Sequence, residues 1–481
     1  MDRKPGNVLV IMSDEHNAGF LGCAGHPLVR TPRLDALAAS GTRFVNAVTN
    51  SPICVPARAS FATGRYVHEI GAWDNAHAYD GRVPGWGRRL QQNGIQVDSI
   101  GKLHYRNEAD PTGFDRQIEP MHISKSGGQV WGSLREPLPT LSGPQMMYRA
   151  IGPGESGYNR YDRRIVDHAA NWLAQKAVDG SQRPWALFVG LVAPHFPLVV
   201  PQRYFDMYAG AQFRRPRLHP DDGYVRHPWV QAMDDFFHID REFDDATRRR
   251  ALAAYMGLCT FLDDCVGELL RALAATGLDR TTTVIYTSDH GDNAGVRGLW
   301  GKCNMYAESI AVPLIVAGPG VPAGRVCKTP ASLVDVAATI IDRLGLDADP
   351  AQRGASLLGL AESGDDAARL VFSEYHAIGS VSASYMVQDA RWKYIHYVGM
   401  RPELFRLDDD PGEERDLAGD ARHAETLQSY ARKLRAICDP EITDRRAKAD
   451  QAKLIARHGG REAVLKSIEL GADAVPGGHT E

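Results

Sequence analysis

The sequence predicts an α/β fold in which a mainly parallel sheet carries helices on both faces. The first observation is a series of short, continuous apolar runs, as at residues 8–12 and 185–192, which are typical of strands covered on both sides. The second is that segments with helical periodicity, such as residues 247–276, lie between these runs. Such alternation of buried strands and helices indicates a doubly covered sheet.

The predicted elements follow this alternation through the first two thirds of the chain. Strands are expected at residues 8–12, 44–48, 95–100, 185–192, 281–288 and 312–316, and helices at residues 31–41, 86–94, 161–177, 247–276 and 334–344. Residues 106–160 and 201–245 show little periodicity, and we expect them to be irregular. The first of these segments is expected near the rim of the active site, where a substrate would be selected.

The pattern of predicted helices and strands changes near residue 365. Short β-like runs separated by turns predict a small antiparallel sheet over residues 370–407, followed by a helix at residues 421–438. We therefore divide the chain into a catalytic α/β domain (1–364), a C-terminal α+β subdomain (365–440) and a charged tail (441–481). The tail is expected either to be disordered or to contact a neighbouring subunit in a homo-oligomer.

Composition narrows the class of protein. The 55 basic and 59 acidic residues nearly balance, which gives no electrostatic reason to expect a nucleic acid or a membrane surface as a partner. No window approaches 18 uninterrupted apolar residues, and the run at residues 8–12 is too short for a secretion signal. The seven cysteines are scattered without metal-type spacing, so we expect free thiols and a cytoplasmic location.

Polar side chains follow the predicted strands where each strand ends. This places the following residues at one edge of the sheet: Asp14, Lys102, His104, His195, Asp289 and His290. Because the carboxyl ends of parallel strands converge on one edge, distant segments can form one site there. For single residues the simpler interpretations are a helix cap for Asp14, a core imidazole for each histidine and a solvated charge for each lysine.

One motif stands out, Cys-x-Pro-x-Arg-Ala-Ser-x-x-Thr-Gly-Arg, which begins at Cys54. Pro56 suits the first position of a helix, so Cys54 would face unpaired N–H groups at the helix start, with Arg58 one turn further on. The simpler interpretation is a small buried cysteine ahead of a helix. The whole pattern, however, resembles the signature of the type I sulfatases, in which the cysteine is oxidised to formylglycine by a formylglycine-generating enzyme.

This resemblance implies an alkaline-phosphatase-like sandwich and a sulfuric ester hydrolase. It also implies a single divalent metal ion held by Asp14, Asp289, His290 and the modified Cys54. The cationic and proton-donating groups would be Arg58, Lys102, His104, His195 and Lys302, which suit a dianion-like transition state. In the implied mechanism Asp289 accepts the proton of the nucleophile, and His195 or Lys302 donates one to the leaving oxygen.

The sequence departs from many sulfatases at two positions. They carry two adjacent aspartates after the first strand and an asparagine after the later aspartate, whereas this chain has Asp14-Glu15 and Asp289-His290. The Asp-His version looks more like the choline sulfatase and phosphonate monoester hydrolase branch. Whether Glu15 is a ligand stays open. Oxygen and imidazole ligands suit Ca²⁺ or Mn²⁺, with His290 favouring Mn²⁺.

Several substrates and functions stay open at this point. A small organic sulfate is the first expectation, and a phosphonate or phosphate monoester or a sulfamate is the alternative on the same site. A choline site would need an aromatic and acidic cage, for which Trp73, Asp74, Trp131 and Glu374 are available, although such aromatic residues can equally pack at a rim. A catalytically silent binding or scaffold protein is the alternative from another class.

Overall fold

The computed structural model describes residues 4–123, 127–140, 150–180, 183–213, 215–468 and 475–476. Its centre is an eight-stranded sheet in the order β11-β2-β10-β9-β1-β7-β4-β5. Strand β10 runs antiparallel to both of its neighbours, and the other neighbouring pairs are parallel. These strands are β1 (Asn7–Asp14), β2 (Gly41–Phe44), β4 (Gln96–Lys102), β5 (Arg116–Met121), β7 (Trp185–Pro194), β9 (Thr282–Ser288), β10 (Leu314–Ala317) and β11 (Arg325–Cys327). The predicted mainly parallel sheet is confirmed.

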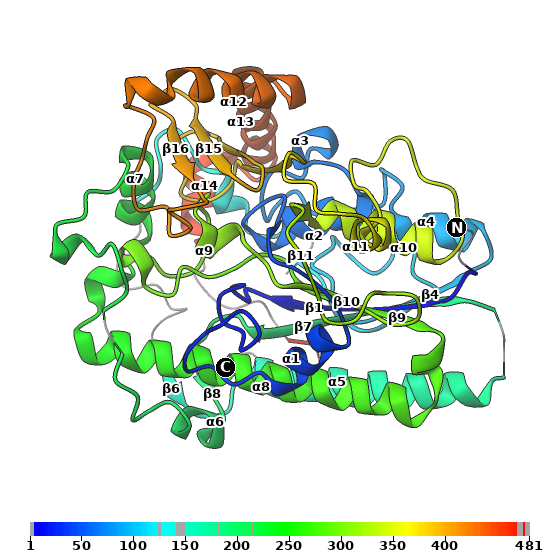
Figure 1. Cartoon of the computed structure of the whole chain (residues 1–481). Coiled ribbons are helices and arrows are strands. Elements are labelled where there is room, and N and C mark those ends of the chain that lie inside the picture. The colour runs from blue at the N-terminus through cyan, green and yellow to red at the C-terminus, as the bar shows by residue number, and fades with distance from the viewer. Residues whose placement is uncertain are drawn as a thin grey trace.

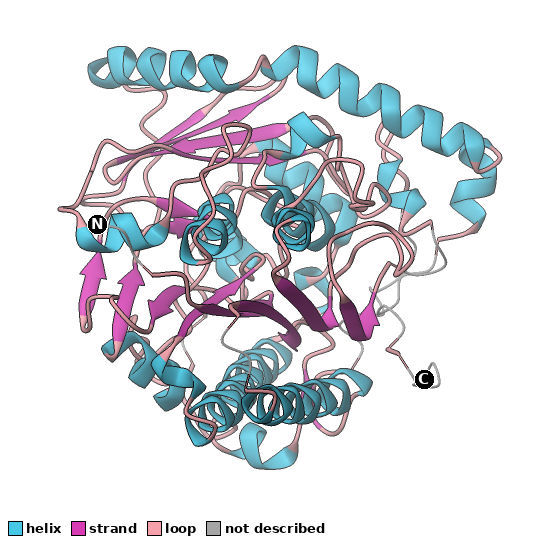
Figure 2. Cartoon of the chain, turned by 90° about the vertical axis from the view of Figure 1, so that its right-hand side faces the viewer, coloured by secondary structure: helices cyan, strands magenta, loops and turns pink. Residues whose placement is uncertain are grey.

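Helices cover both faces of this sheet (Figures 1 and 2). One face carries α1 (Pro32–Ala39), α5 (Gly157–Val178) and α8 (Asp245–Ala275), and the other carries α2 (Cys54–Thr63), α4 (Trp86–Gln92) and α10 (Leu333–Arg343). The other α-helices and short strands before residue 365 are β3 (Ala47–Val48), α3 (Val67–Ile70), β6 (Gly152–Pro153), β8 (Val199–Val200), α6 (Gln202–Asp206), α7 (Pro228–Phe237), α9 (Ala307–Ile310), β12 (Ala331–Ser332) and α11 (Leu357–Glu362).

The burial of β1 on both faces of the sheet explains why its apolar run is continuous. Leu9 and Ile11 point into the core beneath α5 and α8, whereas Val8, Val10 and Met12 point into the core beneath α2 and α10. Successive side chains of a strand alternate between faces, so a strand covered on both sides needs apolar residues at every position.

Two segments predicted to be irregular contain regular elements. Residues 106–160 include β5, one of the two edge strands of the main sheet, which has only one strand neighbour and lacks an apolar run. Residues 201–245 include α7, which starts at Pro228 and buries an apolar face against the C-terminal part of the chain. The prediction of irregular structure was wrong for these two elements and for the shorter β6 and α6.

The C-terminal part forms a four-stranded antiparallel sheet, as predicted. Its strands are β13 (Val371–Tyr375), β14 (Ser384–Gln388), β15 (Trp392–Tyr397) and β16 (Glu403–Arg406), each paired with the next. Helix α12 (Ala424–Ile437) covers this sheet at the top of the molecule in Figure 1. The division of the chain into separate folding units stays a prediction. Within the described part of the chain, no helix has the length and apolar character needed to cross a membrane.

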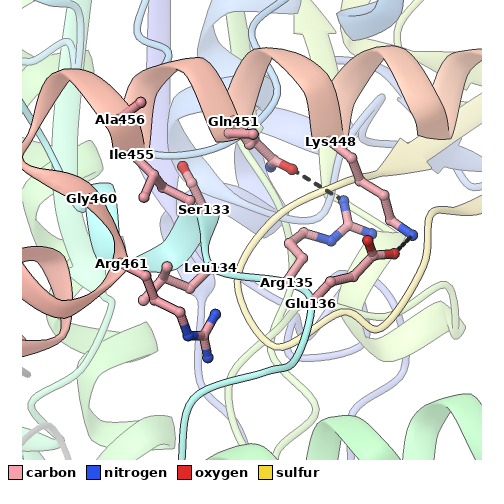
Figure 3. A pocket seen from close by; sticks show the side chains of 11 residues that line it. Ser133, Leu134, Arg135, Glu136, Lys448, Gln451, Ile455, Ala456, Gly460 and Arg461 are labelled. Carbon is pink, nitrogen blue, oxygen red and sulfur yellow. Dashed lines mark hydrogen bonds and ion pairs between the residues drawn. The ribbon is translucent and has the colours of Figure 1, made fainter.

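The predicted tail is helical over much of its length and packs on its own chain. Helices α13 (Pro440–Arg457) and α14 (Gly460–Lys466) lie against the short 3₁₀ helix at Val130–Ser133 and the segment after it. The buried Arg135 contacts Asp444 and Gln451, and a cavity of about 320 Å³ lies between the two segments (Figure 3). Disorder is therefore excluded for α13 and α14, and a role in an oligomer stays a prediction.

A buried carboxyl group on β16 makes stability depend on pH. Glu403 accepts hydrogen bonds from the hydroxyls of Tyr397 (2.8 Å) and Tyr306 (3.1 Å), and burial raises its pKa to about 7 from 4.5. Between pH 4.5 and about pH 7 the folded protein therefore keeps a proton on Glu403 that the unfolded chain releases. The free energy of unfolding falls as the pH rises through this range, by roughly 3 kcal/mol. We expect Glu403→Gln to lose less stability between pH 4.5 and pH 8 in urea unfolding. An equal loss in both proteins would contradict this assignment.

Candidate active site

Cys54 is the first residue of α2 and lies beyond the carboxyl edge of the sheet. Pro56 is the third helical residue, not the first as predicted. It fits there because the first intrahelical hydrogen bond comes from the N–H of Ala57 to the carbonyl of Ile53 at 3.0 Å, so the N–H that Pro56 lacks would have had no acceptor in the helix. The N–H of Val55 donates to Oδ1 of Asn75 at 3.4 Å. The thiol is buried at the positive end of α2.

Arg58 lies one turn after Cys54 in α2 and contacts the ends of three strands. Its Nε donates to Asp289 Oδ2 at 2.8 Å, one Nη to Asp14 Oδ2 at 3.1 Å, and the other Nη to the carbonyl of Lys102 at 2.7 Å. These acceptors lie at the ends of β9, β1 and β4. The guanidinium is only 1% exposed, so its charge is balanced by Asp14 and Asp289 rather than by water.

Four buried side chains bring their ligand-type atoms within 4.8 Å of one another: Asp14, Cys54, Asp289 and His290. The Nδ1 of His290 lies 3.0 Å from the carbonyl of Gly291, and since a carbonyl only accepts, Nδ1 carries the proton. The lone pair of Nε2 then points toward Cys54 Sγ (3.2 Å) and Asp14 Oδ1 (3.7 Å). A neutral imidazole with its proton on Nδ1 can bind a metal ion through Nε2. The backbone carbonyl fixes this tautomer, so the four residues fit a divalent ion.

Two lysines place positive charge beside the same cluster. Lys102 Nζ lies 2.8 Å from Asp14 Oδ2, and Lys302 Nζ lies 3.4 Å from Cys54 Sγ and 3.0 Å from Glu15 Oε2. Burial alone would lower the pKa of Lys302, but the negative charges around it, those of the Glu15 and Asp14 carboxylates among them, raise it well above its ordinary value. Lys302 is therefore a firmly protonated ammonium next to residue 54.

The Cys54 thiol is poorly suited to attack a substrate by itself. Burial raises its pKa well above the ordinary value, and the nearby Asp14 and Asp289 carboxylates raise it further. At neutral pH the side chain is a neutral thiol, and the thiolate is the nucleophilic form of cysteine. The surroundings therefore favour chemistry at residue 54 that does not need a thiolate.

His195 lies on the same side of the cluster as Lys302. Its Nε2 is 3.5 Å from Glu15 Oε2 and 3.8 Å from Asp14 Oδ1, and its Nδ1 is 2.6 Å from the carbonyl of Phe196. Nδ1 therefore carries a proton, and Nε2 of the neutral ring is an acceptor. Burial lowers the pKa of His195 well below its ordinary value, which favours this neutral form.

The structure thus brings together most of the predicted site residues. His104 is buried in the loop after β4, with a left-handed backbone (φ 54°), two residues beyond Lys102. Glu15, which the sequence left open, is not in the four-residue cluster and groups instead with Asp14 and His195. The contact of Asn75 with the N–H next to Cys54 was not anticipated, and no signal in the sequence alone would have indicated it.

The four residues suggested for a choline cage already have other roles. Asp74 accepts hydrogen bonds from Ser133 Oγ at 2.6 Å and from Gln451 Nε2 at 2.8 Å, and it pairs with His77. Glu374 contacts His68 and His376 through its two oxygens. The rings of Trp73 and Trp131 are buried in the apolar core. The acidic groups of this set are therefore satisfied within the protein, so the described structure does not support the cage.

Comparison with known proteins identifies the class that this fold and site define. The chain matches the family model described as Sulfatase over residues 6–346, and the model described as N-sulphoglucosamine sulphohydrolase, C-terminal, over residues 295–439. The first match covers well over half of the 481 residues. The chain belongs to the sulfatase family, and it is an enzyme of the sulfuric ester hydrolase class, as predicted.

Named relatives are similar over nearly the whole chain. A choline-sulfatase of Rhizobium meliloti is 30% identical over 97% of this chain and 92% of its own length. Arylsulfatase K of Bos taurus is 28% identical over 91% of this chain and 82% of its own length. The crystal structure of the phosphonate monoester hydrolase of Agrobacterium radiobacter superposes with a TM-score of 0.73 at 24% identity, covering 90% of this chain and 95% of that one. The predicted alkaline-phosphatase-like fold is thereby confirmed.

Proposed function

We propose that the protein hydrolyses a small organic sulfate monoester at residue 54, after oxidation of Cys54 to formylglycine and with one divalent ion. The supporting observation is the environment of Cys54 Sγ, which lies 3.5 Å from Asp14 Oδ1, 3.2 Å from His290 Nε2 and 3.4 Å from Lys302 Nζ. Metal-ligand groups and an ammonium group therefore all lie within contact distance of the reacting position.

Asp14, Asp289, His290 and the modified residue 54 would hold the ion, with Ca²⁺ or Mn²⁺ as the proposed species. The bound ion would lower the pKa of the attacking group and neutralise developing negative charge. Arg58 and Lys102 orient the two aspartates through the ion pairs described above. The residues that hold the ion are thus fixed before any ligand arrives.

The hydrated aldehyde of formylglycine would supply one hydroxyl for attack on sulfur and a second whose deprotonation later expels sulfate. Asp289 is the proposed acceptor of the proton from the attacking hydroxyl. Lys302 is the better donor to the leaving oxygen, because Nε2 of neutral His195 can only accept. His195 is placed to orient the bound sulfate ester or to take up a proton later in the cycle.

The maturation partner, location and assembly are part of the same proposal. Oxidation of Cys54 requires a formylglycine-generating enzyme. A cytoplasmic location is supported by the seven cysteines, which are all free thiols. A homo-oligomer is proposed, with contacts made by the C-terminal region.

The test is a steady-state comparison of an aryl sulfate, an aryl phosphate, an aryl phosphonate monoester and an aryl sulfamate. The protein is co-produced with a formylglycine-generating enzyme and supplied with Ca²⁺ or Mn²⁺. We expect kcat/KM for the sulfate to exceed the others by at least about tenfold, or about 1.4 kcal/mol in transition-state free energy. Preference for the phosphonate or the sulfamate would overturn the sulfate assignment and select the corresponding alternative on the same site.

A further inference from the structure

The loop between β9 and α9 contributes three residues to the site. It begins with the metal-ligand pair Asp289 and His290 and later presents Lys302. Four of its residues are glycines, and three others have left-handed backbones: Ala294 (φ 47°), Arg297 (φ 59°) and Cys303 (φ 84°). Left-handed conformations are unfavourable for non-glycine residues, so they persist only where surrounding contacts hold them.

Contacts near Lys302 fix the chain on both sides of it. The backbone N–H and the side-chain Nδ2 of Asn293 both donate to the carbonyl of Gly301, at 2.6 Å and 2.7 Å. On the other side, the N–H of Cys303 donates to the carbonyl of Pro52 at 3.1 Å. The lysine is therefore attached to the segment that carries Cys54. The middle of the loop has separate contacts, since the guanidinium of Arg226 donates to the carbonyls of Arg297 at 2.7 Å and Gly298 at 3.0 Å.

The side chain of Arg297 adds contacts from the middle of the loop to α9 and to the C-terminal part of the chain. It is 1% exposed, and its guanidinium donates to Glu308 Oε2 at 2.9 Å and to the carbonyls of Glu413 (2.8 Å) and Gly412 (3.2 Å). The same group lies over the ring of Tyr306, 3.7 Å from its centroid. The side chain of Arg297 thus joins the loop to α9, which follows it, and to the C-terminal part of the chain.

Glu413 holds the other end of the loop. Its Oε2 accepts from the N–H of Ala307 at 3.1 Å, at the start of α9, and its Oε1 accepts from Lys393 Nζ of β15 at 2.6 Å. Glu413 itself has a left-handed backbone (φ 55°). The turn after β16 therefore contacts this part of the chain at two residues, Arg297 and Ala307, which are ten positions apart in sequence.

We propose that Arg297 and Glu413 form a clamp through which the C-terminal sheet positions Lys302 beside residue 54. Both are positioning residues, because their contacts are to the loop and the sheet. The proposal rests on the proposed function, in which Lys302 donates a proton to the leaving oxygen. The C-terminal sheet thereby becomes part of the catalytic apparatus, although none of the predicted catalytic residues lies in it.

The principal test is the variant Arg297→Lys. A lysine keeps the charge, but its single ammonium cannot reproduce the planar fork that reaches three oxygen acceptors. With formylglycine-containing protein, we expect kcat for an aryl sulfate to fall by at least about tenfold, with KM changing by less than about threefold. Because the leaving oxygen would lose its aligned donor, the rate should also depend more steeply on the leaving-group pKa across a series of aryl sulfates.

A second readout is independent of activity. Hydrogen exchange of the peptide covering residues 291–306 should be faster in Arg297→Lys than in the wild type. The matched control is Arg391→Lys, which changes an exposed arginine directly before β15 that pairs with Asp408. It should leave the exchange, kcat and the leaving-group dependence unchanged. Glu413→Gln, which keeps the backbone carbonyl but weakens both side-chain contacts, replaces Arg297→Lys if that variant does not fold.

The two proposals fail in distinguishable ways. If the wild type hydrolyses aryl sulfates and the variant keeps the wild-type kcat, leaving-group dependence or loop exchange, the clamp is overturned while the function stands. If the wild type does not hydrolyse any sulfate ester, the proposed function is overturned, and hydrogen exchange alone decides whether Arg297 anchors the loop.

Discussion

Cys54→Ser and Cys54→Ala are each expected to lose turnover of a sulfate ester by at least about 10⁴-fold, the scale of loss when a catalytic nucleophile is removed. An alanine side chain cannot become a hydrated aldehyde. A serine that is not oxidised has a single hydroxyl, so a sulfate transferred to it would have no second hydroxyl to expel it. Steady-state assay of an aryl sulfate with metal-supplied protein measures this loss.

The control for position 54 is Cys23→Ser. It makes the same exchange of thiol for hydroxyl at a partly exposed cysteine outside the cluster. We expect this variant to keep wild-type turnover and both Cys54 variants to keep the wild-type fold by circular dichroism. Substantial turnover in Cys54→Ser would contradict the proposed chemistry at this residue.

Asp14→Asn is expected to have the second large effect, on metal binding, turnover and stability together. The Asp14 carboxylate is one of the proposed metal ligands, and its Oδ2 also contacts Lys102 Nζ and Arg58 Nη, at 2.8 Å and 3.1 Å. Removing its charge leaves these two buried cations with less compensation, which should destabilise the fold by about 3–5 kcal/mol. Turnover should fall by at least about 10³-fold, because both the ion and the fixed cations lose their alignment.

The measurements are the metal content after gel filtration in Ca²⁺ or Mn²⁺, urea unfolding and steady-state turnover. Asp98→Asn is the matched control, since Asp98 is equally buried and pairs with Arg116 at 2.6 Å, but lies in β4, outside the groups that could hold a metal ion. It should lose stability without losing metal. Full metal occupancy in Asp14→Asn would contradict its assignment as a ligand.

Much of the fold follows from local sequence pattern, because the central strands of the main sheet are buried on both faces. The apolar runs in β1 and β7 are visible for that reason. Strand β5 was missed because an edge strand needs less apolar surface. Helix α7 carried a detectable signal, with Pro228 at its start and apolar residues Trp229, Val230 and Met233 at helical spacing, but it lies in a long segment that otherwise shows little periodicity.

The site was predictable to the extent that it combines strand ends with a motif. Asp14 and Asp289 follow β-strands, whose carboxyl ends converge, and Arg58 lies within the Cys54 motif. The clamp at Arg297 and Glu413 was not predictable, because it depends on backbone carbonyls and left-handed residues that only the folded chain brings together. No local pattern encodes such long-range contacts.

The most direct test of the proposed function measures turnover against the fraction of residue 54 converted to formylglycine. Preparations with graded conversion can be made by varying the amount of formylglycine-generating enzyme, and mass spectrometry of the peptide containing residue 54 gives the fraction. We predict that kcat for an aryl sulfate, calculated per total protein, rises linearly with this fraction and extrapolates to zero at no conversion. The same kcat in unconverted and converted protein would contradict the proposal that formylglycine at residue 54 is the nucleophile.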